Sequence, residues 1–229
     1  MKKFILAAVA AMTFCGVFAQ NRDWANFKRY AESNKELIAG DASKRKVVFM
    51  GNSITEGWAN QHPEFFTENG YVGRGISGQT SYQFLVRFRE DVIDLKPKVV
   101  VINAATNDVA ENTHAYDEDR TMGNIISMVE LAKANKIKVI LTTTLPAESF
   151  GWAKHIKDGA DKIAKLNARI EAYAKKNKIP YVDYYSHMVT DDGRRALKPE
   201  YTNDGVHPTR AGYEVMEAIV LPVIKKMVK

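Results

Sequence analysis

The sequence predicts an α/β fold, with a parallel sheet covered by helices on both faces. Short apolar runs rich in β-branched residues alternate with longer segments of helical periodicity. The runs are apolar almost throughout, which is typical of strands buried on both faces. The length of 229 residues suits one domain with a sizeable core, and the sequence shows no repeat or linker.

Five segments are expected to form strands. The clearest is residues 99–102, because all four residues are β-branched. The others are residues 47–50, which end at Gly51, residues 137–143, residues 180–184 and a weaker candidate at residues 71–74. Ligands in such folds bind beyond the carboxyl ends of the strands, so the loops after Met50, Arg74, Ile102 and Tyr184 are expected to carry the chemistry.

Helical spacing of apolar residues predicts helices between these strands. Residues 85–95 present one apolar face, and this helix stops before Pro97. Further helices are expected around residues 125–132 and 163–173, with a closing helix over residues 213–227. Residues 24–37 also show helical spacing, so the mature chain is expected to open on an amphipathic helix.

The first 19 residues are expected to be a signal peptide, which leaves a single domain over residues 20–229. Two lysines precede an apolar run over residues 4–11, and Ala19 ends the segment before a polar stretch. A membrane anchor would need roughly 20 apolar residues, more than this run provides. A lipoprotein signal, with lipid on Cys15, is another alternative. These features predict a secreted or periplasmic protein without stable membrane insertion.

Composition excludes several functional classes. Cys15 is the only cysteine, so cleavage after Ala19 leaves none for disulfides or thiolate chemistry. The net charge of +6 comes from basic residues spread along the chain, which does not indicate a nucleic-acid-binding surface. The sequence contains no H-E-x-x-H pattern and no Cys/His cluster, so neither a metal nor another cofactor is expected.

Two loops contain the residue types of a serine hydrolase. Ser53 follows the first predicted strand, where a tight turn at Gly51 can expose its hydroxyl, although a helix N-cap explains the segment equally well. Asp204 precedes His207 by three residues and can hold its imidazole, while Pro208 keeps His207 out of the following helix. A serine becomes nucleophilic when such a base takes its proton. Taken alone, D-x-x-H fits an ordinary polar turn better.

Two further loops can stabilise negative charge on a reacting oxygen. Gly78, within residues 74–81, can offer a backbone N–H at close approach, and Asn107, within residues 103–108, its side-chain amide. A plain turn explains each segment as well when it is taken singly. The glycine segment matches neither G-x-x-x-x-G-K-[ST] nor G-x-G-x-x-G, the phosphate-binding patterns.

Together these blocks resemble the SGNH, or GDSL-type, hydrolase superfamily, whose name records Ser, Gly, Asn and His in four blocks. The matching positions are Ser53 in GNSITEGW, Gly78 in RGISGQTS, Asn107 in ATND and His207 in DGVHP. The blocks occur in the family's order and cover most of the mature chain. The resemblance implies a flavodoxin-like, three-layer α/β/α sandwich with a mainly parallel five-stranded sheet.

The resemblance also implies a Ser-His-Asp mechanism without a metal or cofactor. Ser53 would attack an ester carbonyl, and His207, oriented by Asp204, would act as general base and then protonate the leaving alcohol. The N–H groups of Ser53 and Gly78 and the amide of Asn107 would hold the oxyanion. Loss of one such donor typically lowers the rate by a factor on the order of 10²–10³.

Two positions depart from the family's pattern. Asn52 replaces the usual Asp before the serine, and we expect this to change local hydrogen bonding and not the chemistry. Ala105 replaces the usual Gly two residues before Asn107, and its Cβ narrows the backbone choices and could tighten the pocket. The G-x-S-x-G elbow of ordinary α/β-hydrolases is absent.

The expected substrate is a glycan or other small-molecule ester, and the favoured activity is removal of a small acyl group such as acetyl from a carbohydrate. Trp58, Trp152 and Arg74 are candidate substrate-binding residues. For the two tryptophans, packing in the core is at least as common a role, and for Arg74 a surface role is about equally plausible. Trp152 lies in a long connection, residues 145–158, that is expected to cover the pocket. The alternatives are a lysophospholipase or acetylhydrolase acting on lipid esters, and a glycan-binding module that has lost turnover.

Overall fold

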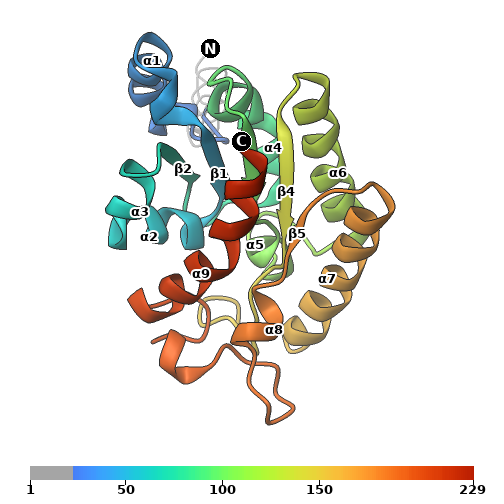
Figure 1. Ribbon diagram of the computed structural model, residues 1–229. Helices are drawn as coiled ribbons and strands as arrows, with labels where there is room; N and C mark the ends of the chain where they lie inside the picture. Colours follow the sequence, from blue (N-terminus) through green and yellow to red (C-terminus); the bar gives the residue numbers. More distant parts are fainter. Residues whose placement is uncertain (1–22) are drawn as a thin grey trace, which may run out of the picture.

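A computed structural model describes residues 23–229, so the predicted signal peptide lies outside the described residues. Five strands form one parallel sheet in the order β2-β1-β3-β4-β5 (Figure 1). They are β1 (Val47–Gly51), β2 (Tyr71–Gly75), β3 (Val99–Ile102), β4 (Lys138–Thr142) and β5 (Tyr181–Val182). All five predicted strands are therefore present, and the prediction of a parallel five-stranded sheet is confirmed.

Helices cover both faces of this sheet, as predicted. Alternate side chains of the strands point to opposite faces, which divides the core into two layers. One face packs against α4 (Ser81–Phe88), α6 (Glu118–Ala134) and α7 (Gly159–Lys176), and the other against α2 (Ser53–Gln61), α3 (Pro63–Thr67) and α9 (Arg210–Met227). In Figure 1, α9 crosses in front of the strands, with α4 behind them. The result is a three-layer α/β/α sandwich.

The amino-terminal helix is shorter than predicted. A 3-10 turn (Phe27–Arg29) comes first, and α1 (Ala31–Ala39) begins only after it. Asn26 has a left-handed backbone, with φ of 56°, which interrupts the helix, and Trp24 is half exposed. The single amphipathic helix predicted over residues 24–37 is therefore wrong in its first half, where side chains from other segments bind the backbone carbonyls.

The helix predicted over residues 85–95 is composite. The regular helix α4 ends at Phe88 and continues as a π-helical turn (Arg89–Ile93), in which the backbone N–H of Asp94 donates to the carbonyl of Arg89. The apolar residues of the predicted face are buried in the core, except that Leu85 is only partly buried.

Three short helices lie at or near the edge where the parallel strands end. They are α2, which follows β1 directly, α5 (Thr106–Val109) after β3 and α8 (Tyr185–Met188) after β5. Since β1 lies between β2 and β3, the loops that follow β1, β2 and β3 lie next to one another, at the point where the strand order reverses. Within residues 23–229, no helix combines the length and the apolar character needed to cross a membrane.

Candidate active site

Ser53, His207 and Asp204 form a hydrogen-bonded chain. The hydroxyl Oγ of Ser53 lies 2.8 Å from Nε2 of His207, and Nδ1 of the same ring lies 2.7 Å from Oδ2 of Asp204. With the ring proton on Nδ1, Nε2 is free to accept the hydroxyl proton while the carboxylate holds the ring in place. The structure thus brings Ser53 next to His207, which lies 154 positions further along the sequence.

Local hydrogen bonds shape the turn that joins Asp204 to His207. Oδ1 of Asp204 accepts the backbone N–H groups of Val206 and His207, at 2.9 and 2.8 Å, which leaves Oδ2 for the ring. Gly205 has φ of 83°, a conformation that L residues with a side chain rarely adopt, and it allows the chain to turn back. The hydroxyl of Thr202 donates to the carbonyl of His207 at 2.8 Å and fixes the far side of the turn.

These hydrogen bonds also set the charge of Asp204. Partial burial by itself would raise the pKa of this carboxyl, but the backbone and ring donors of His207 and the N–H of Val206 outweigh it and lower the pKa to about 2. Asp204 is therefore ionised at neutral pH and can stabilise positive charge on the imidazole.

Ser53 is the first residue of α2, directly beyond the end of β1. A Cβ at Gly51 would lie 2.0 Å from Oγ1 of Thr55, so only glycine allows this close turn from strand to helix. Oδ1 of Asn52 accepts the N–H of Ile54 at 3.0 Å and caps α2. The backbone N–H of Ser53 belongs to the first turn, where helix N–H groups have no intrahelical partner and the helix dipole is positive.

The two departures from the superfamily pattern have visible local effects. Asn52 is completely buried, and its Nδ2 has no hydrogen-bond partner among the described residues, whereas its Oδ1 caps α2. Ala105 is buried and has φ of 85°, a conformation that glycine adopts without strain and alanine does not. Both residues sit next to the site without contributing a reacting atom.

Gly78 and Asn107 lie in the same cleft as Ser53 and His207. Nδ2 of Asn107 donates to the carbonyl of Gln79 at 2.9 Å, and because an amide carries two N–H donors, one remains for an oxyanion. The carbonyl of Gly78 accepts Nδ2 of Asn112 at 3.1 Å, which fixes the peptide plane that follows Gly78. The cleft has a volume of about 290 Å³ and is lined by Ser53, Ser77, Gly78, Asn107, Asn112, Trp152 and His207.

Trp152 is the predicted substrate-binding residue that lines this cleft. Its side chain is 48% exposed, and its ring centroid lies 6.0 Å from that of His207. The indole Nε1 donates to Oδ1 of Asn112 at 2.8 Å. Asn112 and Ser77 were not singled out from the sequence: Ser77 adjoins Gly78 in its block, but no pattern marks Asn112.

The prediction that Trp58 binds substrate is wrong for this cleft. Trp58 is 2% exposed and stacks between Phe65 and Tyr213, with ring centroids 5.2 and 5.7 Å away. Its indole N–H donates to Glu217. Ile54 and Trp58 are four residues apart and both buried, a helical spacing that already points to the core.

The prediction that Arg74 contacts substrate or lies on the surface is also wrong. Arg74 is 3% exposed, donates from Nε and Nη2 to Oδ1 of Asn34, and packs over the ring of Tyr30. Burial lowers the pKa of Arg74 to about 10, so it remains protonated at neutral pH. Its role is to join β2 to α1.

Two carboxylates anchor the segment that contains Gly78. Glu56 of α2 accepts both the backbone N–H and the hydroxyl of Ser77, and it pairs with Arg29 at 2.8 Å. Burial alone would raise the pKa of Glu56, but these donors lower it. Asp108 accepts the N–H of Ser81 at the start of α4, while burial raises the pKa of Asp108.

Across residues 23–229, no group of three or more His, Cys, Asp or Glu side chains could hold a metal ion.

Comparisons with known proteins identify the family of this chain. The sequence model of the GDSL-like Lipase/Acylhydrolase family matches residues 49–215, which contain all four blocks. The crystal structure of a GDSL-like lipase from Bacteroides thetaiotaomicron is similar to this chain with a TM-score of 0.85 and 65% identity, over 88% of this chain and 98% of that chain.

Two curated relatives are more distant. An uncharacterized lipoprotein of Bacillus subtilis, YqeF, is 29% identical over 59% of this chain, and an acetylxylan esterase of Xylanibacter ruminicola is 24% identical over 83% of it. The chain spans 63% of the length of YqeF and 45% of that of the acetylxylan esterase. With the family match covering most of its length, this chain belongs to the GDSL-like lipase/acylhydrolase family of the SGNH hydrolase superfamily.

Proposed function

We propose that this chain is an exported serine esterase that removes small acyl groups, such as acetyl, from a carbohydrate. The observation that carries the proposal is the 2.8 Å contact between Oγ of Ser53 and Nε2 of His207, with Asp204 on the other ring nitrogen. This geometry supplies a nucleophile, a base and a group that orients the base.

The proposed reaction has two halves. Oγ of Ser53 bonds to the ester carbonyl carbon as its proton moves to Nε2 of His207, and the oxyanion is held by the N–H groups of Ser53 and Gly78 and the amide of Asn107. Collapse of this intermediate releases the alcohol, which takes the proton from His207. A water molecule then gives a proton to His207 as its oxygen bonds to the acyl carbon. When this second intermediate collapses, the bond to Oγ of Ser53 breaks, His207 returns the proton to Oγ, and the acid is released.

The size and lining of the cleft favour a substrate with a small acyl group. Its volume of about 290 Å³ is modest, and six of its seven lining residues are polar or glycine. A long acyl chain gains affinity by burying methylene groups against apolar side chains, and Trp152 is the one large apolar side chain here. The exposed indole of Trp152 beside His207 suits the apolar face of a sugar ring.

The relatives also support an exported enzyme that acts on acetylated carbohydrate. An acetylxylan esterase is among them, and a second curated relative is a lipoprotein, which agrees with export. The charged and apolar residues before position 20 support a cleavable leader.

A substrate panel tests the proposal. Purified protein is incubated with acetylated oligosaccharides, and acetate release is measured beside Ser53→Ala as the inactive control. In parallel, the rates with p-nitrophenyl acetate and p-nitrophenyl palmitate are compared. We expect acetate release and a strong preference for the short ester. Hydrolysis of lipid esters without acetate release would replace the carbohydrate substrate with a lipid one.

A further inference from the structure

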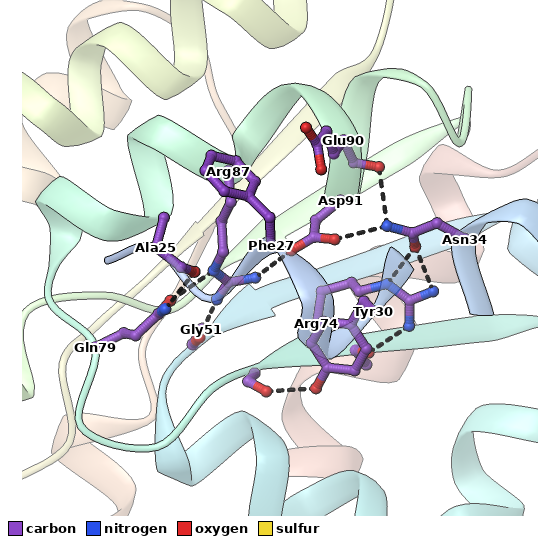
Figure 2. Close-up of polar contacts among 12 residues, drawn as sticks. Ala25, Phe27, Tyr30, Asn34, Gly51, Arg74, Gln79, Arg87, Glu90 and Asp91 are labelled. Carbon is purple, nitrogen blue, oxygen red and sulfur yellow. Dashed lines mark hydrogen bonds and ion pairs between the residues drawn. The ribbon is translucent and has the colours of Figure 1, made fainter. Parts of the chain in front are cut away.

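Arg87 is a fully buried arginine whose guanidinium contacts two segments that carry the proposed catalytic groups. Its Nε donates to Oε1 of Gln79 at 2.6 Å, and its Nη2 donates to the carbonyl of Gly51 at 3.0 Å. Its third donor, Nη1, pairs with Asp91 at 2.7 Å in the π-helical turn. Figure 2 shows the guanidinium between these three partners.

We propose that Arg87 and Gln79 are positioning residues of the esterase reaction, which fix the oxyanion donors relative to the nucleophile. The inference rests on the proposed function of Ser53 as that nucleophile. Neither side chain lines the cleft, so both act through the groups that they hold.

Gln79 connects the two predicted oxyanion donors that lie outside α2. It follows Gly78 directly in the chain, and its backbone carbonyl accepts the side-chain amide of Asn107 at 2.9 Å. Its own side chain is held at both ends, because Oε1 accepts from Arg87 and Nε2 donates to the carbonyl of Ala25 at 2.7 Å. A shift of Gln79 would therefore move Gly78 and Asn107 together.

Gly51 provides the connection to the nucleophile. It ends β1 two residues before Ser53, and its carbonyl accepts both Nη2 of Arg87 and the backbone N–H of Ile76, at 3.0 and 3.2 Å. Ile76 begins the loop that leads to Gly78. One guanidinium thus joins β1, the strand before Ser53, to the loop that contains Gly78.

Residues of the amino-terminal segment complete this hydrogen-bond network by contacting Gln79 and Asp91. Ala25 and Asn34 are buried, and Nδ2 of Asn34 donates to the second oxygen of Asp91 at 2.7 Å (Figure 2). Burial lowers the pKa of Arg87, and the neighbouring carboxylate of Asp91 opposes that shift.

Oxyanion stabilisation depends on donors that are already in place before reaction, and displacement of a donor by about 1 Å can lower the rate by about 10²-fold. A rigid, charged anchor behind the donors meets that requirement.

The test compares two variants that each alter one partner of Arg87. Gln79→Met keeps the length of the side chain and removes its contacts with Arg87 and Ala25. Asp91→Asn, the matched control, removes the charge partner and leaves the bonds from Arg87 to Gln79 and Gly51 in place. For each, kcat and KM with p-nitrophenyl acetate are measured together with the Tm.

We expect Gln79→Met to lower kcat by about 10–100-fold with KM within about threefold, because the acyl group still enters the cleft but its oxyanion is poorly held. Asp91→Asn should lower the Tm at least as much and keep kcat within about threefold. Gln79→Glu, which keeps an oxygen for Nε of Arg87, should recover a large part of kcat. If Gln79→Met does not fold, Gln79→Asn, whose amide is too short to reach both partners, is measured in its place.

Full kcat in the Gln79 variant, or a kcat that falls in step with the Tm in every variant, would overturn the inference. A wild-type protein that cleaves no ester and carries no reactive Ser53 would instead remove the proposed function, and this inference with it. An active wild type with an unaffected Gln79 variant removes the inference alone.

Discussion

Asn112 joins Trp152 to the loop that contains Gly78. Its Oδ1 accepts the indole N–H of Trp152 at 2.8 Å, and its Nδ2 donates to the carbonyl of Gly78 at 3.1 Å. The aromatic surface at the mouth of the cleft is thereby held at a fixed place relative to the proposed reacting centre. This relationship makes Trp152 a residue whose effect should depend on the alcohol part of the substrate.

Trp152→Ala is expected to raise KM for acetylated oligosaccharides by about 3–10-fold, because stacking of an aromatic ring contributes about 0.5–1.5 kcal/mol. The same variant should change kcat/KM for p-nitrophenyl acetate much less, since this substrate has no sugar ring. Steady-state kinetics with both substrates measure the difference. An equal loss on both would place the role of Trp152 in holding the site together and not in binding sugar.

Asn107→Ala removes one of the three proposed oxyanion donors. We expect kcat to fall by a factor on the order of 10²–10³, with KM for p-nitrophenyl acetate nearly unchanged. The far-ultraviolet circular dichroism spectrum and the Tm serve as controls for folding. A well-folded variant with more than half of the wild-type kcat would exclude Asn107 from the oxyanion site.

Asp204→Asn affects both rate and stability. The rate should fall by a factor on the order of 10³–10⁴, because the imidazole loses the acceptor that fixes its tautomer. In the folded protein the pKa of Asp204 is lowered to about 2, whereas an unfolded aspartate titrates near pH 4. Above about pH 4 the ionised carboxylate therefore stabilises the folded state in full, and this contribution is lost as the pH falls from about 4 through 2.

Urea unfolding of wild type and Asp204→Asn across this range measures the effect. The difference in free energy of unfolding should be constant from neutral pH to about pH 4 and should shrink below it. A difference that grows as the pH falls would contradict the hydrogen-bonding pattern around Asp204.

Ala105 is held in the left-handed region, with φ of 85°. Ala105→Gly relieves about 1–2 kcal/mol of strain, but it adds about 0.5–1 kcal/mol of backbone entropy in the unfolded chain and loses about 0.8 kcal/mol of methyl burial. These effects nearly cancel, so we expect a change of less than about 1 kcal/mol in the free energy of unfolding. Ala105→Val should destabilise by about 2–3 kcal/mol, because a β-branched residue is strained at positive φ. Chemical denaturation of both variants checks this order, and a glycine variant less stable than the valine variant would contradict it.

Much of the fold follows from local sequence features. The strand at residues 99–102 coincides with β3, since an uninterrupted β-branched run has few alternatives. The blocks of Ser53, Gly78 and Asn107 follow β1, β2 and β3, so parallel topology brings these three to one edge of the sheet. Asp204 and His207 lie in the turn before α9 and reach the site through that turn.

The features that the sequence missed depend on contacts between distant segments. The backbone carbonyls of Trp24 and Ala25 accept hydrogen bonds from Gln83 and Gln79, more than fifty positions away, so helical spacing alone gave the wrong prediction. Arg74 and Trp58 adjoin motif residues, but which face a side chain occupies is decided by packing, here against α1 and α9. Asn112 has no motif, and only its position between Gly78 and Trp152 reveals it.

Fluorophosphonate labelling with mapping of the modified peptide by mass spectrometry tests the proposed mechanism most directly. The account predicts one adduct per chain, on Ser53, with no adduct in Ser53→Ala and strongly slowed labelling in His207→Ala, because the hydroxyl then has no base within reach. Labelling of Ser53→Ala at the wild-type rate, or an esterase-active wild type whose Ser53 stays unmodified, would contradict it.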